Sequence, residues 1–507
     1  MPEKGSPPGR GAWFADGRWL AVAALLVAVV VRGAFLAEKP FWRDEAWVAM
    51  VVAQRTDHGY DLQRPRPVPP GFVALARLGG ALPVPPEVGY RLPALVAGIA
   101  LVPALARLAG ALGAPAPIPL MLLWLAAGAP ALVYYSRELK PYGIDALIAT
   151  LAPLLALRAF GRAAGDGLSP AAAAAALVAL VAVAPWCTYG GLFAIGAVLA
   201  WGSLRWWLGA DAATRRRWVV VCAVFALSFA AAYAYALSDQ ASSPTLQETW
   251  RPWTFGGQPQ PRGAKALTAT WRYLSLSTVF TYAGAWPLLI PLAALGAATW
   301  PRRGRALLAW TYVVPGALAV GAALANRYLL AEGRLLLFAA PPLLLAAAAG
   351  LALCSRAWRT RPQALAIVAA VGLGLAWSAK AIERRLPPYH NETRAYFQYD
   401  ILHDVGALLD AADRIVPPGG PVFISVYASK PWVYYDRGRF ADAAVCVEPC
   451  PQRGPAFRRW LDRHRRPGWL LLIDDERDVY ARHLAASGRT WREVATVRGG
   501  AIWAIDP

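Results

Sequence analysis

The sequence predicts a polytopic α-helical membrane protein of about eleven transmembrane helices, followed by a small extracytoplasmic α/β domain at the C-terminus. Three observations lead to this fold class. Of the 507 residues, 57% are hydrophobic and only 16% are charged, which is too little charge for the surface of a soluble protein of this length. Apolar runs of about twenty residues, long enough to cross the hydrocarbon core, recur up to residue 381. From residue 382 onward, charge rises and the periodicities of soluble helices and strands begin.

The transmembrane part, residues 1–381, follows from the apolar runs in chain order. The predicted spans cover residues 19–37, 92–112, 117–135, 142–160, 171–187, 190–208, 218–238, 277–299, 306–325, 334–353 and 363–381. The first run has no small-residue cleavage site, and further spans follow it. We therefore expect a retained anchor and not a signal peptide.

The short connections predict the orientation of the spans. Arginine clusters at 158–162, 215–217, 302–305 and 356–361 fall on alternate connections. The positive-inside rule assigns all four to the cytoplasm, together with the N-terminus. The loop 38–91 and residues 382–507 then lie on the extracytoplasmic side. Richness in Ala, Arg, Pro and Gly is typical of a GC-rich bacterial genome, so the expected location is the bacterial cytoplasmic (inner) membrane.

The formal net charge of +20 does not indicate a nucleic-acid partner. The basic residues are spread over short connections and are not gathered on one soluble face with interleaved aromatic residues. Positive-inside placement and attraction to anionic lipids account for the charge. Membrane lipids are therefore the expected partners of these residues.

Three long segments outside the spans are expected to carry function. Segment 38–91 is apolar around residues 72–82, which predicts helices lying along the interface. Segment 239–276 contains several Trp, Arg and Pro residues and Lys265, and its Gly256-Gly257 pair predicts local flexibility. In segment 382–507, residues 401–415 have helical spacing of apolar positions. The predicted strands are 421–427, 469–473 and a pair within 491–505.

Five cysteines are too few for a disulfide scaffold. Cys187, Cys222 and Cys354 lie in or beside apolar runs and are expected to be inert. Cys446 and Cys450 are candidates for a short-loop disulfide if their region is extracytoplasmic. No histidines accompany them at ligand spacing, so a disulfide is favoured over a zinc site.

An acidic pair, Asp44 and Glu45, follows the first span directly. Carboxylates are costly near lipid and tend to face cavities or partners. A positioned carboxylate can accept the proton of an attacking hydroxyl, so both residues are candidate catalytic groups. Both are also candidate ligands of a divalent cation, because hard oxygen ligands suit Mg²⁺, Mn²⁺ or Ca²⁺. The alternative is that the pair only neutralises Lys39, Arg43 or a neighbouring loop.

Two further polar patches, 134–142 and 326–334, share the outer face with the acidic pair. Arginine and lysine stabilise a departing phosphate, so acid and cations together match glycosyl transfer from a lipid phosphate. The candidate donor-phosphate residues are Arg91, Arg137, Lys140, Tyr142, Arg327 and Arg334, with Tyr328 as a further hydrogen-bond partner. The alternative for the cations is snorkelling at the interface. Asp145, one turn into the next span, is expected to pair with Arg137 or Lys140.

The motifs resemble, in the same order, those of the glycosyltransferase-C superfamily. Residues 42–46 resemble its Asp-Glu motif in the first extracytoplasmic loop, and 69–72 and 89–93 resemble the turn and span start that follow it. Residues 135–142 are similar to the patch before the fourth span, and Tyr434-Tyr435 to part of the C-terminal domain. The nearest group is the bacterial branch related to protein O-mannosyltransferases and lipid A aminoarabinose transferases. Val68 stands where that group has a histidine.

The resemblance implies an integral membrane glycosyltransferase. Its donor would be a polyprenyl-phosphate sugar and its acceptor an extracytoplasmic glycan, lipid or protein, with inversion at the sugar carbon. Asp44 would be the general base, and Glu45 would orient Asp44, the acceptor or a divalent ion. The cations would bind the donor phosphate.

Two other classes of function are alternatives to the enzyme. A transporter or lipid flippase typically has internal repeats and polar residues at mid-span. This sequence has no repeat, and its polar residues cluster at the outer ends of the spans, which favours the enzyme. A glycan-binding membrane protein without catalysis would use the C-terminal region instead. Turnover of a lipid-linked sugar distinguishes the enzyme from both.

Overall fold

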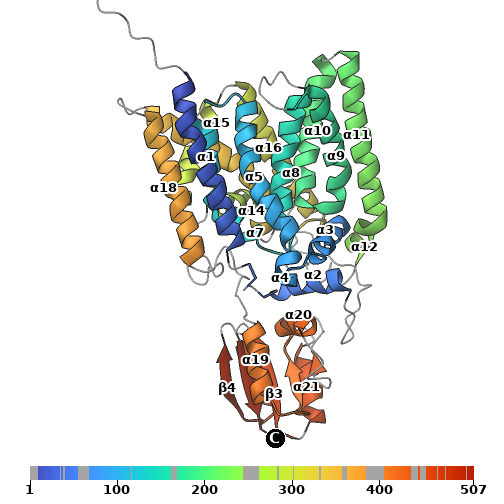
Figure 1. Cartoon of the computed structure of the whole chain (residues 1–507). Coiled ribbons are helices and arrows are strands. Elements are labelled where there is room, and N and C mark those ends of the chain that lie inside the picture. Colours follow the sequence, from blue (N-terminus) through green and yellow to red (C-terminus); the bar gives the residue numbers. More distant parts are fainter. Residues whose placement is uncertain are drawn as a thin grey trace, which may run out of the picture.

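The structure is a computed structural model in which a helical bundle precedes a smaller α/β domain that lies at one end of the bundle (Figure 1). The residues that it describes are 10–34, 36–37, 40–54, 68–115, 117–160, 168–209, 211–243, 262–282, 285–300, 302–330, 333–356, 362–383, 405–435, 444–445, 453–464, 466–473, 476–497 and 500–506. The cysteines of the predicted disulfide, Cys446 and Cys450, lie outside these residues.

The bundle consists mainly of apolar helices that run up and down side by side (Figure 1). Its first half contains α1 (Arg10–Gly33), α5 (Leu92–Ala111), α6 (Pro117–Gly128), α7 (Pro130–Tyr135), α8 (Tyr142–Phe160), α9 (Pro170–Cys187), α10 (Gly190–Gly209) and α11 (Ala212–Ala232). The second half contains α15 (Trp286–Thr299), α16 (Arg302–Leu324), the 3₁₀ turn η4 (Gly333–Ala339), α17 (Ala340–Arg356) and α18 (Pro362–Glu383). By length and composition, five helices of the described chain can cross a membrane, and several shorter ones are also apolar.

The predicted span 117–135 is broken into α6 and α7 at Ala129. Pro130 has no N–H to donate to the carbonyl of Ala126, so the helix cannot continue unchanged. The fully buried Arg32 of α1 replaces the lost bonds, because its guanidinium donates to the carbonyl oxygens of Ala126 (2.9 Å) and Ala127 (2.8 Å). Backbone breaks at membrane depth are tolerated where protein groups satisfy the freed carbonyls. The break leads the chain into the polar segment 136–141.

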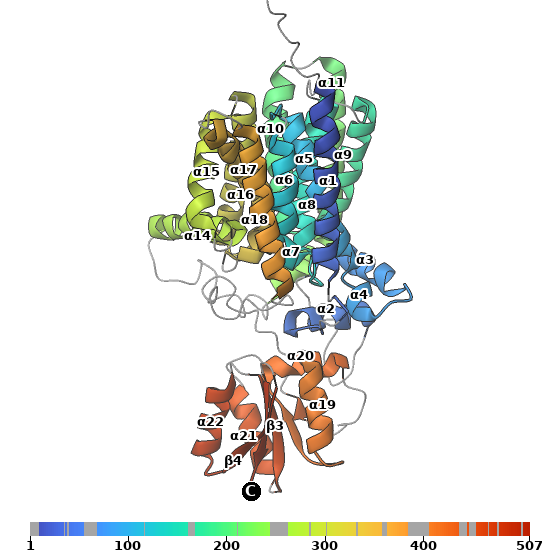
Figure 2. The ribbon, with the colours of Figure 1, turned by 60° about the vertical axis from the view of Figure 1, so that its left-hand side comes forward.

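Segment 239–276, predicted to lie outside the spans, contains most of α12 (Ser238–Ser242) and most of α14 (Arg262–Tyr282). The predicted span 277–299 accordingly begins later, with α15 at Trp286. The Ser and Thr hydroxyls of α14 bond to carbonyl oxygens of the preceding turn, as Thr270 does to Ala266 (2.9 Å). Such residues are compatible with a helix when their hydroxyls bond back to it. Figure 2 shows α14 lying across the direction of the neighbouring helices.

The predicted helices within segment 38–91 are confirmed. They are α2 (Arg43–Ala53), α3 (Pro70–Gly80) and α4 (Pro86–Gly89), and they lie between the bundle and the α/β domain (Figure 1). The helices α3 and α4 approach closely, since a Cβ atom on Gly89 would lie 2.7 Å from the carbonyl oxygen of Gly79. This close approach fixes where the chain enters α5.

The C-terminal domain is built on a five-stranded sheet with the strand order β2-β1-β3-β5-β4. Its strands are β1 (Val422–Ile424), β2 (Ala444–Val445), β3 (Gly468–Ile473), β4 (Trp491–Val497) and β5 (Gly500–Ile505). Strand β1 is parallel to β2 and β3, whereas β5 is antiparallel to β3 and β4. The helices are α19 (Val405–Ile415), α20 (Val426–Tyr435), α21 (Arg453–Arg463) and α22 (Arg477–Ala486).

Most of the predicted elements of this domain are present, and one differs. The helix within 401–415, the strand at 469–473 and the strand pair within 491–505 correspond to α19, β3 and β4–β5. The strand expected at 421–427 ends at Ile424, and α20 begins at Val426. A short apolar run does not distinguish a buried strand from the first turn of a buried helix. The early start of α20 matters because this helix faces α2.

Candidate functional site

The acidic motif lies at the end of the bundle that faces the α/β domain. Asp44 and Glu45 occupy the first turn of α2, where the free N–H groups of a helix favour carboxylates. Consecutive residues of an α-helix point about 100° apart, because a turn contains 3.6 residues. Glu45 consequently points inward and is fully buried, while the side chain of Asp44 remains 23% exposed. The two carboxylates therefore differ in what they can reach.

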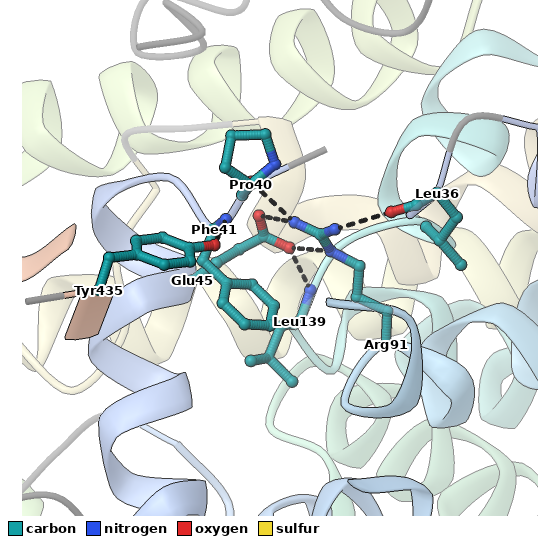
Figure 3. Close-up of polar contacts among 7 residues, drawn as sticks. All are labelled: Leu36, Pro40, Phe41, Glu45, Arg91, Leu139 and Tyr435. Carbon is teal, nitrogen blue, oxygen red and sulfur yellow. Dashed lines mark hydrogen bonds and ion pairs between the residues drawn. The ribbon is translucent and has the colours of Figure 1, made fainter. Parts of the chain in front are cut away.

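Glu45 forms a buried, bidentate ion pair with Arg91. The Nε and Nη2 atoms of Arg91 donate to Oε1 (2.8 Å) and Oε2 (2.6 Å) of Glu45, and neither side chain is exposed. Figure 3 shows the guanidinium between this carboxylate and the carbonyl oxygen of Leu36. Glu45 Oε1 also accepts the backbone N–H of Leu139 at 2.7 Å. Charge-assisted bidentate pairs of this kind fix geometry strongly.

The Glu45–Arg91 pair joins segments that are distant in sequence. Besides Glu45, Arg91 holds the carbonyl oxygens of Leu36 (3.3 Å), after α1, and Pro40 (3.0 Å), before α2. Arg91 itself precedes α5, and Leu139 belongs to the polar segment 136–141. Arg91, predicted to bind the donor phosphate, thus donates its hydrogen bonds to protein groups where these segments meet.

Asp44 faces a cation from the second half of the chain. Arg334, in η4, donates from Nη2 to Asp44 Oδ2 at 3.2 Å, and its side chain is 14% exposed. Its guanidinium carbon lies 5.6 Å from the ring centroid of Trp42 and 6.0 Å from that of Tyr142. Residues from each of the three predicted patches, Asp44, Tyr142 and Arg334, therefore lie close together.

Two further cations of the site are buried and have hydrogen-bond donors that no described residue accepts. Arg137 is 2% exposed and donates to the carbonyl oxygen of Ala34, while its Nε has no hydrogen-bond partner among the described residues. Lys140 is 7% exposed and makes neither a hydrogen bond nor an ion pair in the described part of the chain. The indole N–H of Trp42 is likewise buried with no partner among these residues. Unsatisfied buried donors are costly unless something else binds them.

Electrostatics couples these groups. Lys140 lies in segment 136–141, outside the helices, and burial lowers the pKa of its ammonium group, whereas the nearby Asp44 carboxylate raises that pKa. Glu138, which was not among the predicted site residues, is fully buried and also raises the pKa of Lys140 and of Arg91. Its position between Arg137 and Lys140 in a polar run is the signal that could have identified it. An anion bound beside Lys140 would counteract the effect of burial.

Several predicted residues bind elsewhere. Arg327 is exposed and donates to the carbonyl oxygen of Ala241 in α12 (2.9 Å), and the hydroxyl of Tyr328 donates to the carbonyl oxygen of Leu335 (2.5 Å). The expected pairing of Asp145 with Arg137 or Lys140 is wrong. Asp145 instead accepts from the hydroxyl of Thr188 and the N–H of Gly191 (3.3 Å), at the N-terminus of α10. A helix N-terminus offers free N–H donors to a carboxylate, which explains the different partner.

The two carboxylates of the acidic pair face different cations. Both Glu45 oxygens face Arg91, one also accepts the N–H of Leu139, and Asp44 faces Arg334, so the carboxylates do not converge on one point. Within the described ranges, no group of three or more His, Cys, Asp or Glu side chains could hold a metal ion.

No protein-family model matches the sequence, and no curated protein matches it. Two solved structures of ArnT from Cupriavidus metallidurans are similar to the chain in three dimensions. The apo structure has a TM-score of 0.58 and 13% sequence identity, over 97% of this chain and 98% of ArnT. The structure bound to undecaprenyl phosphate has a TM-score of 0.55 and 14% identity, over 98% of each chain. The chain has the fold of ArnT.

The likeness to ArnT covers both the helical bundle and the α/β domain, since nearly the whole of each chain is matched. The resemblance seen in the short motifs is thereby supported as a likeness of fold to ArnT. The mostly helical architecture with several apolar helices is confirmed as well.

Proposed function

We propose that the chain is an integral membrane glycosyltransferase that transfers a sugar from a polyprenyl-phosphate donor to an extracytoplasmic acceptor. One observation carries the proposal: a partly exposed carboxylate, Asp44, faces Arg334 at the end of the bundle that also holds the buried cations Arg137 and Lys140, whose donors are not all satisfied by the described residues. An acceptor hydroxyl needs a base, and a lipid phosphate needs cations. The fold of ArnT, one structure of which holds undecaprenyl phosphate, supports the lipid-phosphate part of the proposal.

In the proposed reaction, Asp44 accepts the proton of the acceptor hydroxyl as its oxygen attacks the anomeric carbon of the donor sugar. The bond from that carbon to the phosphate oxygen breaks, and the lipid phosphate leaves with the bonding electrons. Arg137, Lys140 and Arg334 stabilise the charge that develops on the phosphate. A single displacement of this kind inverts the anomeric configuration.

In this proposal Glu45 and Arg91 act as positioning residues. Their pair holds the first turn of α2 against the segment that carries Arg137 and Lys140, through the N–H of Leu139. The base and the phosphate cations are thus held at a fixed separation. This orients the acceptor hydroxyl and the donor phosphate for the transfer of the sugar.

We also propose eleven membrane passes, with the N-terminus in the cytoplasm and the site outside. Figure 1 shows α11 running from the end of the bundle remote from the α/β domain down to α12. Arg215, Arg216 and Arg217 in the first turns of α11 therefore lie opposite the candidate site, as the positive-inside rule requires.

Labelling with an impermeant thiol reagent tests this orientation in a variant without the native cysteines. Cysteines introduced at Lys39, beside the acidic motif, and at Ser487, exposed at the end of α22, should react from outside in intact cells. A cysteine at the exposed position Arg216 should react only after the membrane is opened. The reverse pattern would contradict the orientation and, with it, the extracytoplasmic acceptor.

Turnover of polyprenyl-phosphate sugars by the purified protein tests the function itself. We expect Arg137→Ala to lower kcat/KM for the donor by about 10- to 100-fold, because a hydrogen bond between charged groups is lost. Arg137→Lys should restore only part of it, since lysine lacks the planar fork. The exposed Arg492→Ala, on β4, is the matched control. Normal turnover by both Arg137 variants would mean that this residue does not bind the donor phosphate and acts only as an interface anchor.

A further inference from the structure

We propose that the C-terminal α/β domain positions the catalytic loop, through the side chain of Tyr435. Tyr435 is the last residue of α20, the helix that lies between the sheet and α2 (Figures 1 and 2). The inference rests on the proposed function, because it assigns Tyr435 as a positioning residue for Asp44. It adds a requirement that the acidic motif alone does not reveal, namely that the domain must be docked for turnover.

The contact is a hydrogen bond from the backbone of the acidic motif. The N–H of Phe41 donates to the hydroxyl oxygen of Tyr435 at 2.7 Å, as Figure 3 shows. Phe41 is fully buried, so its N–H would lack water as a partner if the hydroxyl were removed. Its ring also packs edge-on against Tyr434 (centroids 5.2 Å apart) and stacks on Tyr435 (6.4 Å). The domain thus holds both the backbone and the side chain of this residue.

A short series of contacts joins Phe41 to the candidate base. The ring of Phe41 stacks on Tyr90, with centroids 5.9 Å apart, and the guanidinium carbon of Arg91 lies 4.8 Å from its centroid. Arg91 in turn holds the carbonyl oxygen of Pro40 and the carboxylate of Glu45. Residues 40–42 lead directly into α2, so their placement sets the direction of its first turn. A shift there would displace Asp44 from the cations that face it.

The hydroxyl of Tyr435 is suited to a fixed role. Burial raises the pKa of its phenol well above the usual value, and the charge of Glu87 raises it further. The group therefore stays neutral over the physiological range and keeps its acceptor lone pair for Phe41.

Tyr435→Phe tests the inference with a minimal change, because it removes the hydroxyl and leaves the ring. We expect kcat to fall about tenfold, while KM for the donor changes little, since Arg137 and Lys140 are not moved. Adding Tyr435→Phe to Asp44→Asn should cause no further loss, because Tyr435 acts through Asp44. The matched control is Tyr480→Phe, which removes a buried hydroxyl from the domain core packed against Phe457. An unchanged kcat in Tyr435→Phe would overturn the inference.

Hydrogen exchange provides a readout that does not depend on activity. Peptides covering residues 40–53 should exchange faster in Tyr435→Phe than in the wild type or in Tyr480→Phe. Equal exchange in all three proteins would overturn the inference even if turnover were altered. If the wild type turns over no lipid-linked sugar but exchange still depends on Tyr435, the proposed function fails and the positioning contact stands.

Discussion

Replacing Asp44 with asparagine should lower kcat by about two to four orders of magnitude, the range that a positioned general base typically supplies. Asparagine keeps the shape of the side chain and can still accept a hydrogen bond from Arg334, but it cannot take the acceptor proton. The measurement is steady-state turnover of a polyprenyl-phosphate sugar by the purified variant. Donor binding and thermal unfolding should stay close to those of the wild type.

The matched control for Asp44→Asn is Asp239→Asn. Asp239 is an exposed carboxylate in α12, at the same end of the bundle, and the same isosteric change there should leave kcat unaltered (Figure 1). Near-normal turnover by Asp44→Asn would remove the proposed base and return the acidic pair to a structural role.

Replacing Arg91 with methionine should give the largest loss of stability, about 3–5 kcal/mol, because it leaves the carboxylate of Glu45 buried without its partner. The Glu45–Arg91 pair is fully buried, whereas Arg334 and Asp44 are partly exposed. Arg334→Met should therefore destabilise the protein much less, since partly exposed pairs contribute little. Thermal unfolding in one detergent, followed for both variants, compares the two losses.

A double variant measures the interaction between Glu45 and Arg91 apart from the other contacts of each residue. Glu45→Gln keeps an acceptor for the N–H of Leu139 but removes the charge, so Glu45→Gln/Arg91→Met should recover much of the stability lost in Arg91→Met. A loss of stability in the double variant equal to the sum of the losses in the two single variants would mean that Glu45 and Arg91 are not energetically coupled. Turnover should remain impaired in the double variant, because the segments joined by the guanidinium are no longer held in register.

Much of the fold could be predicted from local sequence because its helices are set by apolar runs. The span predicted at 142–160 agrees in both bounds with α8, and the strand expected at 469–473 corresponds to β3. The failures have local chemical reasons. The span predicted at 277–299 covers the end of α14 and the whole of α15, whose start is marked by Pro287, and Pro130 ended α6 within a run that was apolar throughout.

The sequence by itself determined which chemical groups are present at the site and roughly where. A carboxylate pair after the first span and cations at 137, 140 and 334 could be recognised because each lies in a polar patch at the end of an apolar run. Their convergence on one face followed from the alternation of spans. The helical phase at the start of α2 was not evident from these patterns, so the two carboxylates could not be told apart.

Only the tertiary structure decided the role of each group. Glu45 is buried because Arg91, 46 residues away, meets it as α5 begins, and Asp44 stays accessible because it points a third of a turn away. The N–H of Phe41 finds its acceptor in Tyr435, 394 residues later. Partners so distant in the chain are set by how whole helices and the α/β domain pack. Local periodicity records which face of an element is apolar, but not which residue of another element will lie against it.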